Sequence, residues 1–116
     1  MIISLKRFKK SLIYARRGIF KAYKEEQNLQ VQLKIAIIVL VLTLFADISK
    51  VELLLLVFAI AMVIIAELAN SVVERVVDIL KPRLSESAKE IKDIMAGIVL
   101  IASIVSVIIG SMIFFI

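Results

Sequence analysis

The final stretch of this sequence, from Ile94 to Ile116, contains no charged residue. An α-helix rises about 1.5 Å per residue, so about 20 consecutive apolar residues cross the hydrocarbon core of a bilayer. The stretch therefore predicts a transmembrane helix over 94–116. Small side chains recur along it and favour close packing against a second helix. They are Ala96, Gly97, Ala102, Ser103, Ser106 and Gly110.

Two further apolar segments, 30–46 and 51–73, precede this helix and are separated by a short polar turn at 47–50. Hydrophobic residues make up 62% of the 116 residues, whereas soluble domains contain about 45–50%. A chain this short cannot hide so much apolar surface in one core, because small domains bury only part of theirs. We therefore expect a single-domain (1–116), all-α membrane protein with three transmembrane helices.

The second span is predicted to continue as a helix to Leu80. Lys81-Pro82 then ends it, because proline cannot continue a helix and disfavours helical backbone in the residue before it. The stretch 84–93 is polar and amphipathic, with Ser85 as the expected N-cap of the following helix.

Residues 1–29 are predicted to form an amphipathic helix in the membrane interface. Apolar side chains recur there at three- and four-residue spacing, and Lys and Arg fill the other faces. Basic residues gather in this segment and in 75–93, whereas the 47–50 turn has only Lys50. Because cytoplasmic loops are enriched in Lys and Arg, we expect the N-terminus in the cytoplasm. A nucleic-acid partner is not expected, since the rest of the chain is membrane span.

The sequence contains no cysteine and no histidine. Disulfides, thiol nucleophiles, imidazole bases and the usual zinc sites are therefore excluded. Any acid–base or metal chemistry must rest on carboxylates, whose hard oxygen atoms suit Mg²⁺.

Carboxylates inside or next to a membrane span are energetically costly and mark a candidate functional site. At about 100° per residue, Glu67, Glu74 and Asp78 fall on one stripe of the second span, and Asn70 lies roughly 60° to its side. Several carboxylates on one stripe favour chemistry. The alternative is a polar seam that joins helices, with Arg75 paired to Asp78.

Two polar clusters are expected at the same cytoplasmic interface as Glu74. The first, 25–28, precedes the first span, and its Glu26 could hold a divalent cation jointly with Glu74; the alternative is an ordinary polar helix end. The second places Lys92 and Asp93 on one helical face just before the last span. It is either a phosphate-binding site or a run of charges that sets the topology.

This inventory is the one that phosphoryl transfer requires: carboxylates for a metal, cations for phosphates, and a base to take a hydroxyl proton. The sequence contains neither a P-loop nor a glycine-rich kinase loop. A kinase with this sequence must therefore be of a different design.

These residues resemble the small prokaryotic diacylglycerol kinase family, which includes the undecaprenol kinases. Residues 67–78 are similar to the family signature Glu-x-x-Asn-Ser/Thr-x-Ile/Val-Glu-x-x-x-Asp. Residues 92–100 are similar to its Lys-Asp-x-x-Ala-Gly-Ala-Val-Leu stretch, and residues 26–28 to its Glu-Arg-Asn. Tyr14 and Gly18 match positions in its amphipathic helix. The resemblance covers nearly the whole chain.

The resemblance implies a lipid kinase of the bacterial cytoplasmic membrane that uses ATP and Mg²⁺. It also implies a homotrimer whose active sites lie at the cytoplasmic surface and are shared between neighbouring chains. Glu67 would be the general base for the hydroxyl of a lipid alcohol, and Glu26 and Glu74 would bind the metal. The residues that would bind the nucleotide or position the catalytic groups are Arg7, Tyr14, Arg17, Glu26, Glu74, Asn70, Lys92 and Asp93.

Gln27 and Gln30 stand where the undecaprenol kinase branch has arginines. They remove no catalytic group, but they leave the choice of lipid open. The Glu-x-Asn motif at 26–28 and the loop with Pro82 favour undecaprenol over diacylglycerol.

Two functions of other classes fit parts of the sequence. A non-catalytic membrane adaptor explains the spans and the basic N-terminus, but not Glu67, Asn70 and Glu74 on one stripe. An ion or proton pathway would use Glu67 as a relay inside the membrane. The interfacial position of Glu74 and Asp78, with basic residues nearby, favours phosphate chemistry instead.

Overall fold

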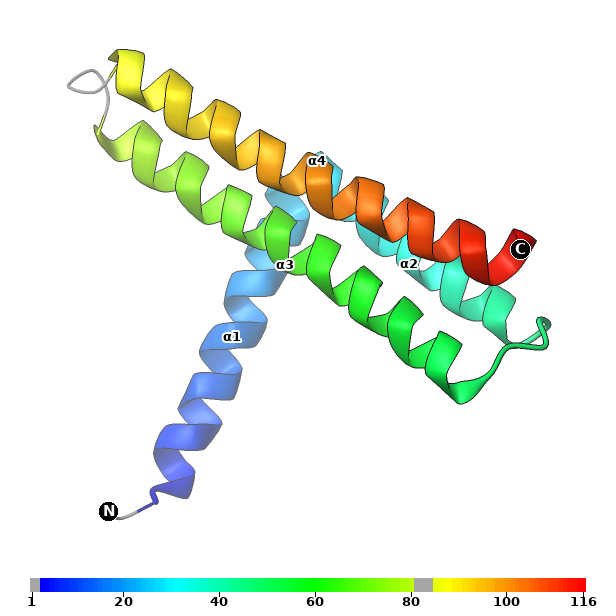
Figure 1. Cartoon of the computed structure of the whole chain (residues 1–116). Helices are drawn as coiled ribbons and strands as arrows, with labels where there is room; N and C mark the ends of the chain where they lie inside the picture. Colours follow the sequence, from blue (N-terminus) through cyan, green and yellow to red (C-terminus); the bar gives the residue numbers. More distant parts are fainter. Residues whose placement is uncertain (1–2, 81–84) are drawn as a thin grey trace.

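The computed structural model describes residues 3–80 and 85–116, which form four α-helices (Figure 1). The helices are α1 (Leu5–Glu25), α2 (Gln27–Thr43), α3 (Lys50–Leu80) and α4 (Ser85–Phe115). The all-α prediction is confirmed. The expected helix stop at Lys81-Pro82 and the capping role of the Ser85 side chain lie outside the described residues.

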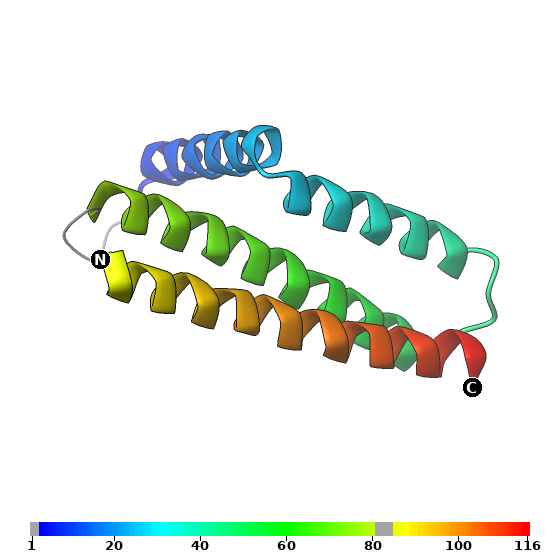
Figure 2. The same ribbon diagram turned by 90° about the horizontal axis from the view of Figure 1, so that it is seen from above.

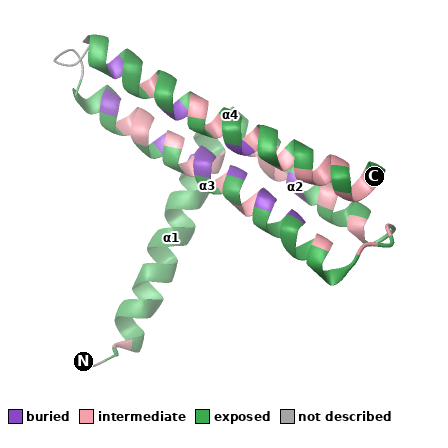
Figure 3. Ribbon diagram, viewed as in Figure 1, coloured by how far each residue is buried: buried purple, intermediate pink, exposed green. Residues whose placement is uncertain are grey.

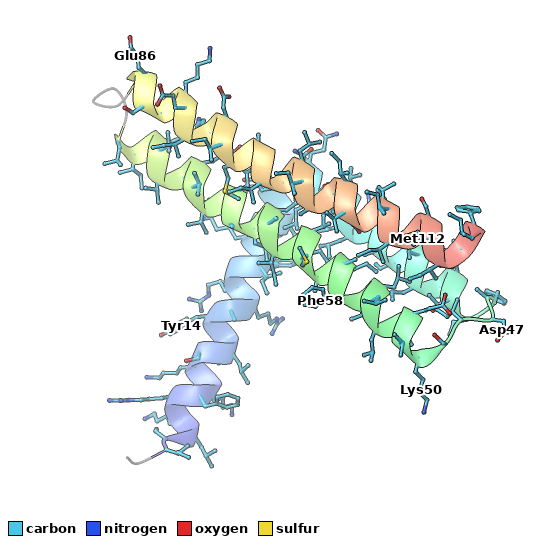
Figure 4. All side chains as sticks on the ribbon, viewed as in Figure 1. Tyr14, Asp47, Lys50, Phe58, Glu86 and Met112 are labelled. Atoms are coloured by element: carbon cyan, nitrogen blue, oxygen red, sulfur yellow. The ribbon has the colours of Figure 1, made fainter. Side chains whose placement is uncertain are left out.

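The central helix is α3, which contacts each of the other three. α3 and α4 lie side by side and antiparallel, and α2 packs on α3 from another side (Figures 1 and 2). α1 projects at a steep angle from the layer that α2, α3 and α4 form (Figure 1). The turn that carries Asp47 and Lys50 lies at the opposite end of the layer from Glu86 (Figure 4).

α1 begins with a side-chain cap, because the Ser4 hydroxyl accepts a hydrogen bond of 3.3 Å from the backbone N–H of Arg7. Nearly all of its side chains are exposed in the single chain, the apolar ones as well as the basic ones (Figure 3). Ala22, where α1 meets the other helices, is the buried exception. An exposed apolar face beside a basic one suits a helix that lies in a membrane interface.

The boundary between the first two helices lies at Glu26, so the expected helix over 1–29 is shorter than predicted. Glu26 has extended backbone angles, φ −113° and ψ 108°. Its N–H donates to the Ala22 carbonyl and ends α1, while its carbonyl accepts from the Gln30 N–H and starts α2. The expected first span, 30–46, is correspondingly replaced by a helix over Gln27–Thr43.

α3 starts with a reciprocal pair of hydrogen bonds between Ser49 and Glu52. The Ser49 hydroxyl accepts from the Glu52 N–H at 3.1 Å, and the Glu52 carboxylate accepts from the Ser49 N–H at 3.0 Å. This capping box satisfies two backbone donors that the first turn of a helix leaves without partners. It explains why the helix begins beside the polar turn.

α3 and α4 are each long and apolar enough to cross a membrane, in agreement with the expected spans 51–73 and 94–116. Each has 31 residues and is therefore about 46 Å long, well beyond the ~30 Å hydrocarbon core. α2 has 17 residues, or about 25 Å. Its passage through the membrane stays a prediction.

The core lies between α3 and α4, where Val63, Ala66 and Ala102 are buried with Val99 packed against them. The small side chains of Ala66 and Ala102 let the helices approach each other, as expected for Ala102. Gly97 and Gly110 do not contribute to this packing, because a Cβ atom added at either would meet nothing within 4 Å.

Candidate active site

The polar residues of α3 and α4 lie at one end of the helix pair. About 20 residues of helix cross the hydrocarbon core, so a crossing that starts at Lys50 is complete near Asn70. The same count back from Phe115, the end of α4, reaches the region of Ala96. Because the two helices are antiparallel, their polar segments lie at the same end of the pair.

Glu67 is the buried carboxylate of this region, with 7% of its surface exposed. It accepts no hydrogen bond from any residue that the structure describes. The carboxylates of Glu26 and Glu74 lie close enough to interact with it electrostatically. Placing a largely buried carboxylate beside two others is costly, so helix packing alone does not explain this position.

Glu26 reaches α3 from the break between α1 and α2. The Ser71 hydroxyl donates to Glu26 Oε1 at 3.1 Å, and an Arg75 guanidinium nitrogen lies 4.0 Å from the same oxygen. Ser71 itself is buried, with 3% exposed. The structure thus places Glu26 beside the polar stripe of α3, although Glu26 and Ser71 are 45 residues apart in sequence.

Glu74 lies one helical turn after Asn70, and the Asn70 side-chain amide donates to Glu74 Oε1 at 3.4 Å. Within the described residues no group of three or more Asp, Glu, His or Cys side chains is arranged to hold a metal ion. Glu26 and Glu74 can therefore supply two carboxylates but not a complete cage. Mg²⁺ suits such a site, since it commonly binds one or two carboxylates together with substrate phosphates and water.

Lys92 joins α4 to α3 through Asp78, with 3.0 Å between Lys92 Nζ and Asp78 Oδ1. Lys92 is half-buried, and its neighbour Asp93 is exposed. The predicted cation therefore lies at the end of the polar stripe of α3.

Arg7, Tyr14 and Arg17 lie along α1, where all three are exposed. The Arg17 guanidinium stacks over the Tyr14 ring at 5.6 Å from its centroid, and Tyr14 lies well away from the layer of the other helices (Figure 4). In the described part of the chain, none of the three side chains forms a hydrogen bond or ion pair with Glu26, Glu67 or Glu74.

The contacts that Ser71, Arg75 and Glu25 make in this site were missing from the sequence prediction, although each residue lies in a segment that it named. The alternative interpretation of the stripe, a polar seam between helices, paired Arg75 with Asp78; in the structure Arg75 pairs with Glu25, whose carboxylate accepts a hydrogen bond of 2.5 Å from its NH2 group. This hydrogen bond lowers the pKa of the Glu25 carboxyl. One feature of the sequence could have drawn attention to Arg75: it is the one cationic residue between Val51 and Leu80.

Comparison with known proteins identifies the family. The model of prokaryotic diacylglycerol kinase matches residues 13–114. The chain is 34% identical over 110 residues to an undecaprenol kinase of Bacillus subtilis, covering 95% of this chain and 89% of that protein. It is 33% identical over 103 residues to a diacylglycerol kinase of Haemophilus influenzae, covering 88% and 87%. The chain therefore belongs to the prokaryotic diacylglycerol kinase family and is a lipid kinase.

Proposed function

We propose that this protein transfers the γ-phosphate of ATP to the primary hydroxyl of a membrane lipid alcohol, with Glu67 as the general base. The observation that carries the proposal is Glu67 itself, a buried residue whose carboxylate accepts no hydrogen bond from the described residues, placed where the apolar and polar parts of α3 meet. A lipid hydroxyl at the interface would supply the missing donor. Functional carboxylates are the default interpretation of such a position.

The reaction follows from this placement. Glu67 takes the proton of the lipid hydroxyl while the hydroxyl oxygen forms a bond to the γ-phosphorus of ATP. The bond between the γ-phosphorus and the oxygen bridging it to the β-phosphorus breaks, and ADP leaves. The products are a lipid monophosphate and ADP, and the proton on Glu67 returns to water before the next turnover.

Glu26 and Glu74 would hold Mg²⁺, which supplies charge neutralisation of the phosphate oxygens when it is bound. Their carboxylates fit the ion chemically, and both interact with the carboxylate of Glu67. Asn70 orients Glu74 through the hydrogen bond between them. These residues bring the metal-binding and proton-accepting groups to one end of α3.

The nucleotide would be held by the cations around this cluster. Lys92 suits the phosphates, and Asp93 lies beside it at the interface. Among the described residues, Arg7, Tyr14 and Arg17 form no hydrogen bond or ion pair with Glu26, Glu67 or Glu74, so we propose that they serve the site of a neighbouring chain in a homotrimer. A guanidinium stacked on an aromatic ring is already held in place for a phosphate.

The topology that suits this chemistry has three spans, α2, α3 and α4, in the bacterial cytoplasmic membrane. α1 would then lie in the cytoplasmic interface with its basic side chains toward anionic lipids. The polar ends of α3 and α4 would face the cytoplasm, where ATP is present.

We propose undecaprenol as the acceptor, because the similarity to the undecaprenol kinase covers 95% of the chain against 88% for the diacylglycerol kinase. Diacylglycerol is the second candidate, since it offers the same primary hydroxyl. The Pro82 loop that favours undecaprenol lies outside the described residues.

The test is a competition assay with purified protein in mixed lipid, with Mg²⁺ and labelled ATP. Undecaprenol and diacylglycerol are supplied together at equal mole fraction, and then each alone. Preferential label in undecaprenol monophosphate supports the proposal. Preferential label in phosphatidic acid overturns the choice of acceptor, and label in neither lipid from folded protein overturns the kinase assignment.

A further inference from the structure

We infer that Ser71 and Arg75 are positioning residues for Glu26: they fix its carboxylate, and with it the corner between α1 and α2, in the place where Glu26 can bind metal. This inference rests on the proposed role of Glu26. It gives a role to Ser71, which the family signature contains, and adds Arg75 and the Glu25–Arg75 ion pair, which the signature does not specify.

Glu26 needs such a support because it is the break between two helices. Its backbone ends α1 and begins α2, but its side chain makes no capping hydrogen bond with either helix. A carboxylate on an uncapped, extended residue is not held by its own element. Its position must come from α3.

Arg75 provides this support by binding two partners at once. Its Nε donates to Ser71 Oγ at 3.3 Å, and its NH2 donates to the Glu25 carboxylate at 2.5 Å. The guanidinium is a rigid planar fork, so these two contacts fix the distance between the end of α1 and the middle of the polar stripe. A lysine, with one nitrogen, could not make both contacts in this geometry.

Ser71 connects the cation to the metal-binding carboxylate. Its Oγ accepts from Arg75 Nε and its hydroxyl hydrogen goes to Glu26 Oε1. The donors therefore run in one direction, from guanidinium to hydroxyl to carboxylate, and bonds in such a chain polarise and strengthen one another. The contacts of Glu26 with Ser71 and Arg75 on α3 both involve Oε1, and Glu26 would still have carboxylate lone pairs with which to hold a metal ion.

Arg75 also balances the charge of the site. Glu25, Glu26 and Glu74 all interact electrostatically with it; Glu25 is hydrogen-bonded to it, and Glu26 forms an ion pair with it at 4.0 Å. Without a cation among them, like-charged carboxylates would separate and turn the corner between the helices outward. Residues that support a metal ligand in this way typically contribute about 10-fold to 100-fold to metal affinity or activity.

The experiment measures Mn²⁺ binding by electron paramagnetic resonance, in the presence of a nonhydrolysable ATP analogue and without any turnover. Ser71→Ala, Arg75→Gln and Glu26→Gln are each expected to weaken Mn²⁺ binding by about tenfold or more. Ser71→Thr, which keeps the hydroxyl, is expected to restore most of the affinity. In kinase assays the same variants should raise the Mg²⁺ requirement with little change in the KM for the lipid.

Lys21→Gln is the matched control. It removes the other ion pair of Glu25, a 4.0 Å contact between exposed side chains, and should leave Mn²⁺ binding unchanged. Mn²⁺ binding that depends on Glu26 but is indifferent to Ser71→Ala and Arg75→Gln would overturn the positioning role. If the wild-type protein bound Mn²⁺ without any dependence on Glu26, the proposed metal site itself would be wrong, and the inference with it.

A second readout needs neither metal nor activity. The chain has no cysteine, so spin labels can be placed at Ser11→Cys on α1 and Ile79→Cys on α3, both at exposed positions. Excess unlabelled protein restricts the measured distances to a single chain. Arg75→Gln should broaden the distance distribution and Lys21→Gln should not; a distribution unchanged by Arg75→Gln contradicts the proposed corner support.

Discussion

Lys92 on α4 reaches across to Asp78 on α3, with 3.0 Å between Nζ and Oδ1, at the end of the helix pair where the carboxylates gather. Asp78 is the more exposed partner, with 60% of its side chain accessible against 33% for Lys92. Ion pairs this exposed contribute at most about 1 kcal/mol to stability. This pair by itself therefore adds little stability, and binding a phosphate is the role that we propose for Lys92.

Lys92→Met is accordingly expected to raise the KM for ATP by about tenfold or more, because a charge-assisted hydrogen bond to a phosphate is lost. Asp78→Asn should change the free energy of unfolding by less than about 1 kcal/mol and the KM for ATP much less than Lys92→Met does. Steady-state kinetics and denaturant unfolding in detergent check both. A wild-type KM for ATP in Lys92→Met would show that the lysine has only the structural role.

Glu74→Gln should raise the Mg²⁺ concentration needed for half-maximal activity by about tenfold or more, since even the loss of an outer-shell partner has an effect of that size. Asn70→Ala, which removes only the 3.4 Å hydrogen bond to Glu74, should shift it in the same direction by less. Titration of activity with Mg²⁺ at saturating ATP measures both. An unchanged Mg²⁺ requirement in Glu74→Gln would rule out its metal role.

The Glu25–Arg75 pair predicts that the attachment of the α1–α2 corner to α3 is acid-sensitive. Arg75 lowers the folded-state pKa of Glu25 below its ordinary value of 4.5. A depressed pKa means that the stabilisation is fully present above the unfolded pKa and is lost as the pH falls through the folded one. The distribution of spin-label distances between α1 and α3 should therefore broaden only below pH 4.5. In the Arg75→Gln variant the distribution should already be broad at neutral pH. Broadening that begins at neutral pH in the wild type would contradict this assignment.

Passage of α2 through the membrane can be decided by labelling single cysteines from one side. If α2 spans, the turn after it lies on the opposite side from α1. Asp47→Cys should then react with an impermeant thiol reagent in intact spheroplasts, while Ser11→Cys should react only after permeabilisation. Ser87→Cys, exposed at the start of α4, serves as the control on the cytoplasmic side. Reaction of Asp47→Cys and Ser11→Cys from the same side would leave only α3 and α4 as spans.

The sequence predicted the elements well because hydrophobic length and helical period are local properties. The segments around 51–73 and 94–116 became α3 and α4, and the common stripe of Glu67 and Glu74 follows from helical geometry alone. The break between the first helices was placed too late, at 29 instead of 26. No glycine or proline marks Glu26, and its extended backbone accompanies contacts with α3 that a local pattern cannot reveal.

The contacts between helices were the part that could not be predicted. The partner that the alternative interpretation offered for Arg75 was Asp78, three residues along the same helix, whereas in the structure Arg75 binds Glu25, 50 residues away. The sequence prediction included Ser71 in the signature but assigned it no partner. Which face of α3 meets the α1–α2 corner depends on how the helices pack, and several rotations of α3 satisfy the same apolar pattern.

The most direct test of Glu67 as the catalytic base is phosphate transfer to the lipid acceptor by Glu67→Gln and Glu67→Asp. The amide is nearly the same size but cannot accept the proton, so activity should fall about 100-fold to 10,000-fold, with ATP binding and folding retained. The shorter carboxylate of Glu67→Asp should keep a measurable part of the activity. If Glu67→Gln transfers phosphate at the wild-type rate, Glu67 is a structural residue of the helix pair and the proposed mechanism is wrong.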